Sequence, residues 1–66
     1  MADDLGPDGL SRLRHDLRTP LTVVIGFAEI LAGSRPLSDE HRRDYAERVL
    51  NAAIEIRDMI DAAKLD

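Results

Sequence analysis

The sequence predicts an all-α protein, an antiparallel two-helix hairpin that pairs with a second copy to form a homodimeric four-helix bundle. Two long segments place apolar residues three and four positions apart, which is the repeat of an amphipathic helix and not of a strand. A short stretch rich in turn-forming residues, 33–38, separates them. A chain of 66 residues without cysteine buries little surface alone, so self-association is the expected source of stability.

Residues 1–9 are rich in aspartate, glycine and proline and predict a flexible lead-in before a helical domain over 10–66. The first helix is expected over about residues 9–32, with Asp8 as a candidate N-cap and Gly33 as the C-terminal cap. Its apolar stripe consists of Leu10, Leu13, Leu17, Leu21, Val24, Ala28 and Leu31.

The loop is expected at about residues 33–38 and the second helix at about 39–64. Ser38 is a suitable N-cap, and Asp39 and Glu40 suit the positive end of the helix dipole. The apolar stripe comprises Tyr45, Val49, Ala52, Ile56, Met59 or Ile60, and Ala63, widened by Leu50 and Ala53. The charged outer face comprises Arg43, Asp44, Glu47, Arg48, Glu55, Asp58 and Asp61. One hairpin cannot enclose a core, whereas two related by a twofold axis can.

The formal net charge of −4 argues against nucleic acid and anionic membranes as partners, because both attract basic surfaces. No apolar run approaches the roughly 20 residues that cross a bilayer, and the acidic start of the chain is unlike a secretory signal. His15 and His41 lack the spacing and companion ligands of a metal site. We therefore expect a cytoplasmic chain, free or within a membrane-bound protein, with no metal and no membrane contact.

The most distinctive string is HDLRTPLT, residues 15–22, inside the first predicted helix. His15 falls on the face opposite the apolar stripe, where it is exposed to partners. An uncharged imidazole nitrogen is a good nucleophile near neutral pH. The carboxylate of Asp16 can hold a proton on one ring nitrogen and leave the other free to attack. The alternative for Asp16 is a solvated acid among neighbouring arginines.

Two further residues of this string bear on the same chemistry. Thr19 lies one turn after His15 on the same face, where its hydroxyl can bind a water or a phosphoryl oxygen. Alternatively, Thr19 hydrogen-bonds its own helix backbone. Pro20 has no N–H and opens the preceding turn, but the apolar stripe continues in phase beyond it. We therefore interpret Pro20 as a hinge and not as the end of the helix.

Three residues around the histidine are expected partner contacts. Arg18 belongs to a locally basic stretch that suits phosphate or an acidic pocket, although solvated arginines are the commoner case. Thr22 and Gly26 lie on the His15 face, and a glycine there permits close approach of a partner's backbone.

The segment from His15 to Leu21 resembles the phosphoacceptor box of the dimerisation and histidine-phosphotransfer domain of bacterial sensor histidine kinases. Asp16 stands where this family usually has glutamate. Residues 24–31 look like the continuation of the family's first helix. Asn51-Ala52-Ala53, with Ile56, Met59 and Ile60, looks like its second helix. The likeness covers about residues 10–65.

The resemblance implies a homodimer in which His15 takes the γ-phosphoryl group of ATP from a separate ATP-binding domain and passes it to an aspartate of a response-regulator receiver domain. Asp16 would assist as base or ring orienter, and Thr19 would position water for dephosphorylating the regulator. Pro20 would be the bend between kinase and phosphatase states. The regulator would dock on the helix faces below His15, and the chain itself would bind no cofactor.

The ATP-binding domain has no counterpart in this sequence, so we expect no autophosphorylation by the chain alone, and whether it counts as an enzyme stays open. A segment of a larger kinase and a stand-alone histidine phosphotransfer protein both fit, and we favour the first. A non-catalytic dimerisation scaffold is a third possibility. A helix-turn-helix nucleic-acid binder is disfavoured by the acidic charge and the lack of a basic recognition helix.

Overall fold

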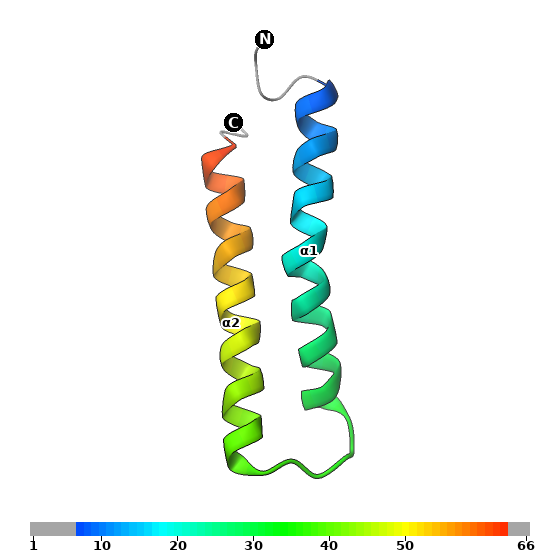
Figure 1. Cartoon of the computed structure of the whole chain (residues 1–66), viewed down its shortest axis with the longest axis vertical. Coiled ribbons are helices and arrows are strands. Elements are labelled where there is room, and N and C mark those ends of the chain that lie inside the picture. Colours follow the sequence, from blue (N-terminus) through cyan, green and yellow to red (C-terminus); the bar gives the residue numbers. More distant parts are fainter. Residues whose placement is uncertain (1–6, 64–66) are drawn as a thin grey trace.

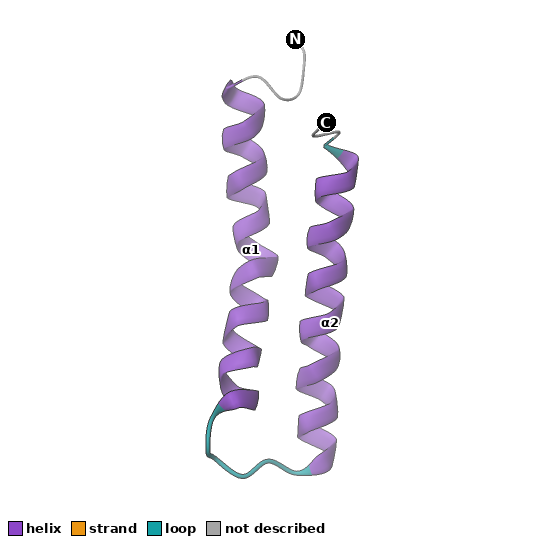
Figure 2. Cartoon of the chain, turned by 180° about the vertical axis from the view of Figure 1, so that it is seen from behind, coloured by secondary structure: helices purple, strands orange, loops and turns teal. Residues whose placement is uncertain are grey.

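The computed structural model describes residues 7–63, which form two antiparallel α-helices joined by one loop (Figure 1). Helix α1 spans Pro7–Ala32 and helix α2 spans Asp39–Ala62. Figure 2 shows the same hairpin from behind, with the loop at the end remote from the start of α1 and the end of α2. The predicted all-α hairpin is confirmed, while the pairing of two hairpins stays a prediction. Residues 1–6 of the expected lead-in and residues 64–66 lie outside the described residues.

The first helix begins at Pro7, so Asp8 lies within its first turn and the prediction of Asp8 as N-cap is wrong. Proline suits this position because the first N–H groups of a helix have no partner inside the helix, and its fixed φ is already helical. The helix continues without interruption through Pro20 to Ala32. The interpretation of Pro20 as lying inside one helix is therefore confirmed.

The two helix ends beside the loop differ in their caps. The amide of Gly33 donates to the carbonyl of Ile30 at 3.3 Å, and Gly33 is not in the left-handed conformation of a glycine cap. Ser38 is the N-cap of α2, as predicted. Its Oγ accepts a hydrogen bond from the amide of His41 at 3.0 Å. Asp39 and Glu40 occupy the first turn, where their charges face the positive end of the helix dipole.

Contact between the helices is narrow. Pro20 and Ala52 are the buried residues within 9–63, the range whose side chains the structure describes. Small or ring-shaped side chains at these positions let the two backbones approach closely. The half-buried apolar positions around them are Leu13, Leu17, Val24, Phe27, Ala28, Leu31, Tyr45, Val49, Ile54, Ile56, Met59 and Ala63.

An aromatic cluster joins the helices on the loop side of Pro20. The rings of Phe27 and Tyr45 lie 5.2 Å apart with a 36° tilt, and His41 stacks on Tyr45 at 5.8 Å. The guanidinium of Arg48 lies over the Phe27 ring, 5.5 Å from its centre. These contacts hold the lower half of the hairpin together through a side chain, Phe27, that the predicted stripe omitted.

In α1, two residues of the predicted stripe are not buried against the other helix, and in α2 the same holds for Leu50, Ala53 and Ile60. Leu10 and Leu21 are 44% and 45% exposed. Residue spacing alone predicts this stripe, and spacing does not distinguish the centre of the contact face from its edges. The real contact line runs instead through Pro20 and Phe27. Neither helix of the described chain combines the length and apolarity needed to cross a bilayer.

Candidate functional site

The three residues predicted to carry chemistry lie in the upper half of α1, and all are exposed. His15 and Asp16 are consecutive, and Thr19 follows one turn later. Among the hydrogen bonds and ion pairs of residues 7–63, none joins His15 to Asp16 or to Thr19. The imidazole is thus open to an incoming group, and Asp16 stands beside it without being bonded to it.

Pro20 lies directly below these residues on the inner side of α1, where it is buried. Because proline has no N–H, the carbonyl of Asp16 has no donor four residues further along. The missing helical hydrogen bond therefore belongs to Asp16, the residue directly after the histidine. This places the predicted hinge inside the hairpin contact and not on the solvent side.

The hydroxyls of the two threonines have different partners. Thr22 Oγ1 donates to the carbonyl of Arg18 at 2.8 Å. Thr19 appears in no side-chain hydrogen bond within the described range. The alternative of backbone bonding that was open for Thr19 is therefore seen at Thr22 instead. Thr19 keeps its hydroxyl available for a water or a phosphoryl oxygen.

The other expected partner contacts are also accessible. Arg18 and Thr22 are exposed, and a Cβ added to Gly26 would meet no atom within 4 Å. Gly26 therefore has no packing role inside this hairpin. With Thr22, Val23, Phe27 and Ile30 it lines a shallow, mainly apolar hollow on α1.

A groove between the two helices begins beside Thr19 and runs toward the loop. We name it the interhelical groove; its residues are Thr19, Pro20, Val23, Phe27, Arg48, Asn51, Ala52 and Glu55. Arg48 and Glu55 were predicted on the charged outer face; both are exposed, but they also line this groove beside α1. Arg48, Asn51 and Glu55 are three and four residues apart, so the sequence already places them on one face of α2. That this face borders a groove follows only from the position of α1.

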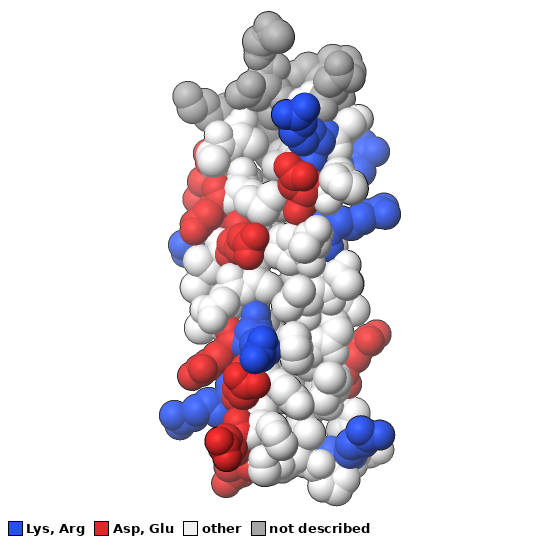
Figure 3. Space-filling model, viewed as in Figure 1, with Lys and Arg blue, Asp and Glu red and all other residues white. Residues whose placement is uncertain are grey.

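Charged side chains are unevenly distributed on the face seen in Figure 3. Acidic and basic groups alternate along α2, whereas uncharged atoms cover much of the lower half of α1. Three ion pairs occur within the described residues, all inside α2: Arg42–Asp39, Arg48–Asp44 and Arg57–Asp58. All are exposed, so each contributes little to stability.

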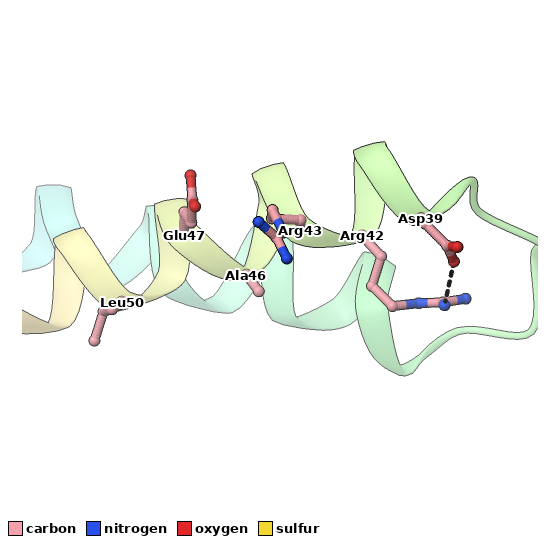
Figure 4. A pocket seen from close by; sticks show the side chains of 6 residues that line it. All are labelled: Asp39, Arg42, Arg43, Ala46, Glu47 and Leu50. Atoms are coloured by element: carbon pink, nitrogen blue, oxygen red, sulfur yellow. Dashed lines mark hydrogen bonds and ion pairs between the residues drawn. The ribbon is translucent and has the colours of Figure 1, made fainter.

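A second hollow lies on α2 alone, near the loop (Figure 4). Ala46 and Leu50 form its apolar part, and Asp39 pairs with Arg42 at its edge at 3.5 Å. Arg43 and Glu47 complete it. None of the predicted site residues reaches it. Within the described residues, no group of acidic and histidine side chains is arranged to hold a metal ion.

Residues 10–65 match the family described as the His Kinase A (phospho-acceptor) domain. The match includes the histidine string of α1, the loop, and all of α2, and the chain belongs to this family. The chain is therefore a phosphoacceptor and dimerisation domain of the histidine-kinase type, the class used in two-component signal transduction.

Similar proteins include the "Cell-division control histidine kinase PdhS" of Brucella ovis, Brucella abortus and Brucella melitensis. Each is 30% identical to this chain over 63 residues. The alignment covers 86% of this chain and 6% of each relative, so the chain corresponds to a small part of those kinases. No solved structure matches the chain significantly.

Proposed function

We propose that this chain is the phosphoacceptor and dimerisation domain of a larger sensor histidine kinase, located in the cytoplasm. The observation that carries the proposal is an exposed His15, five residues before a buried Pro20, within a region that matches the phospho-acceptor family. The named relatives are themselves histidine kinases. His15 accepts phosphate in this proposal, and two partners share access to it.

The first step uses ATP held by a separate catalytic domain. An imidazole nitrogen of His15 attacks the γ-phosphorus, an N–P bond forms, the bond to the β-phosphate oxygen breaks, and ADP leaves. Asp16 is the positioning residue for this attack. A proton held on the far nitrogen by a carboxylate keeps the attacking nitrogen uncharged.

The second step passes the phosphoryl group to a receiver domain. A carboxylate oxygen of the receiver's aspartate attacks the phosphorus, the N–P bond breaks, and the imidazole of His15 leaves. Docking below His15, with Arg18, Thr22 and Gly26 among the contacts, brings the aspartate to the phosphorus. In the reverse regulatory activity, Thr19 positions the water that hydrolyses the receiver's aspartyl phosphate.

Transfer from phosphorylated receiver domains tests the proposal. Receiver domains of the same organism are phosphorylated with acetyl phosphate and mixed with the chain, whose intact mass is then measured at neutral pH. We expect one added, acid-labile phosphate on the wild type and none on His15→Ala. His41→Ala is the matched control, because His41 is the other histidine and is exposed on α2. It should take up phosphate like the wild type.

Phosphate on His15→Ala, or its loss in His41→Ala, would contradict the assignment of His15. If no receiver transfers phosphate to the folded wild type, a histidine-kinase ATP-binding domain and ATP are added to the same assay. Uptake then identifies a kinase segment that only donates to receivers. No uptake in either assay would favour a dimerisation scaffold.

A further inference from the structure

The upper half of α1 carries positive charge that is not neutralised by ion pairs within the described part of the chain. Arg12, Arg14 and Arg18 all lie within one turn of His15, and Asp16 is the one acidic residue among them. The three ion pairs found within residues 7–63 all belong to α2. Arg12 and Asp16 are four residues apart, but no ion pair joins them. The arginines of this stretch are therefore available to an anion.

Helical geometry makes Arg12, and not Arg14, a neighbour of His15. Residues three apart on a helix surface have Cβ atoms about 5–6 Å apart, whereas adjacent residues do not face each other. Side chains on an α-helix also lean toward its N-terminus, so the ring of His15 is expected over the turn that contains Ser11 and Arg12. All four side chains are exposed. A group attached to the imidazole is therefore placed within reach of Arg12.

A phosphoryl group on His15 creates a demand for cationic hydrogen-bond donors at this turn. Such a group carries close to two negative charges and three strong acceptor oxygens at neutral pH. Ser11 offers one neutral hydroxyl, whereas the guanidinium of Arg12 offers a full charge and five N–H donors. A guanidinium binds phosphate through two parallel hydrogen bonds, which are among the strong charge-assisted contacts of proteins. Arg12 is therefore the residue of this turn best suited to hold the phosphoryl oxygens.

We propose that the guanidinium of Arg12 binds the phosphoryl group once this group is attached to His15. The inference rests on the proposed function, because it takes His15 as the phosphoacceptor. The contact exists in the phosphorylated chain and not in the unphosphorylated one, so it stabilises the phosphorylated chain alone. Arg12 thereby shifts the distribution of phosphate between His15 and the receiver's aspartate toward His15.

The equilibrium constant of phosphoryl transfer separates this role from receiver docking. In one direction the imidazole of His15 attacks the phosphorus, the N–P bond forms, and the carboxylate of the receiver leaves; the reverse reaction exchanges the attacking and the leaving group. The equilibrium constant depends on the free reactants and products and not on contacts within their complex. A docking residue therefore changes both rate constants by the same factor, whereas a residue that binds the phosphoryl group on His15 changes their ratio.

The test measures transfer in both directions with one receiver domain that exchanges phosphate with the chain. All forms of the chain carry His41→Ala, so that His15 is the one histidine left. Transfer to His15 starts from the receiver phosphorylated with acetyl phosphate. Transfer from His15 starts from the chain phosphorylated with phosphoramidate, which donates its phosphoryl group to imidazole and releases ammonia. The ratio of the two second-order rate constants at low concentration is the equilibrium constant for transfer to His15.

We expect Arg12→Gln to lower this equilibrium constant about fivefold, the effect of losing one exposed charge-assisted contact. Arg14→Gln is the matched control, because it removes the same charge from the same turn on another side of the helix, and it should stay within about twofold. Raising NaCl from about 0.1 M to about 1 M shortens the Debye length from about 10 Å to about 3 Å. The effect of Arg12→Gln should then fall to within about twofold. Circular dichroism checks that both variants keep their helices.

An unchanged equilibrium constant in Arg12→Gln, an equal loss in Arg14→Gln, or a loss that persists in 1 M NaCl would each overturn the role of Arg12. Equal changes of both rate constants in Arg12→Gln, with their ratio unchanged, would assign this residue to docking and overturn the proposal as well. In all these cases the chain that keeps Arg12 still takes phosphate on His15. Failure of the proposed function shows instead as no uptake by that chain from any receiver or ATP-binding domain.

Discussion

At the scale of single residues, Thr19 and Thr22 are both exposed on α1 but differ in the partners of their hydroxyls. The Thr22 hydroxyl donates to the carbonyl of Arg18, which lies within the turn that Pro20 opens. A hydroxyl bonded to its own backbone braces or bends a helix and offers little to a partner. The Thr19 hydroxyl is the one that remains available for water beside His15.

Replacement by valine, which keeps the shape and removes the hydroxyl, separates these roles. We expect Thr19→Val to slow dephosphorylation of the phosphorylated receiver by about tenfold or more, because a hydrogen bond to a charged group contributes about 1.5–3 kcal/mol. Thr22→Val should slow it less than Thr19→Val does, because the Thr22 hydroxyl is already bound to the carbonyl of Arg18 and is not available to the water. The measurement is phosphate release from the receiver in the presence of each variant. A larger loss in Thr22→Val than in Thr19→Val would reverse the assignment.

Some of the residue-level picture was predictable from the sequence and some was not. Exposure of His15 followed from its position opposite the apolar stripe, because a helix with one apolar face leaves the other in water. Burial of Pro20 did not follow, since the same spacing also fits a stripe centred on Leu21. Only the packing of α2 decides between them. The catalytic roles of His15, Asp16 and Thr19 remain predictions.

At the scale of the elements, α2 depends on its N-cap. The Ser38 side chain satisfies the amide of His41, which otherwise has no acceptor within the helix. We expect Ser38→Ala to lower the free energy of unfolding by about 0.5–2 kcal/mol. Thermal or urea unfolding at one fixed protein concentration measures the change. Ser34→Ala, in the same loop, is the control and should be close to neutral, and equal losses in both variants would contradict the capping role.

The ends of the helices show what local sequence can and cannot predict. Ser38 was predictable as an N-cap because a serine followed by two acidic residues and a helical pattern is typical of a helix start. The first residue of α1 was not predictable, because proline is favoured as the first helical residue and aspartate as the residue before it. With Pro7 and Asp8 adjacent, the sequence does not decide between the two starts. Gly33 follows the helix as expected, but the last turn closes through Ile30 without the left-handed conformation.

At the scale of the whole molecule, one hairpin leaves large apolar side chains in water. The residues concerned are Leu10, Leu21, Val23, Ile25, Ile30, Leu50 and Ile60, each exposed by 37–57%. Val23 borders the interhelical groove. Ile25 is two residues further along and therefore about 160° around the helix, on the opposite side of the hairpin. A second copy is expected to cover that opposite side, as the predicted four-helix bundle requires.

Glutamate substitutions at these two positions test which side dimerises. We expect Ile25→Glu to give a monomer by light scattering and a lower melting temperature, because a carboxylate would enter an apolar interface. Val23→Glu should remain dimeric and lose phosphoryl transfer from the receiver. The melting temperature of the wild type should rise with protein concentration. A monomeric Val23→Glu beside a dimeric Ile25→Glu would place the dimer interface on the groove side.

The inward position of Pro20 has a mechanical consequence. Because the proline faces α2, a bend of α1 at this turn lies in the plane that contains both helix axes. His15 is five residues above it, about 7.5 Å along the helix, so a bend of about 10° displaces it by about 1.3 Å. The predicted hinge at Pro20 would leave the contacts of the aromatic cluster below it unchanged and would move only the part of α1 above it. Such a bend would change the width of the interhelical groove and the position of His15 together. A displacement of His15 of this size is enough to align or misalign a phosphoryl group.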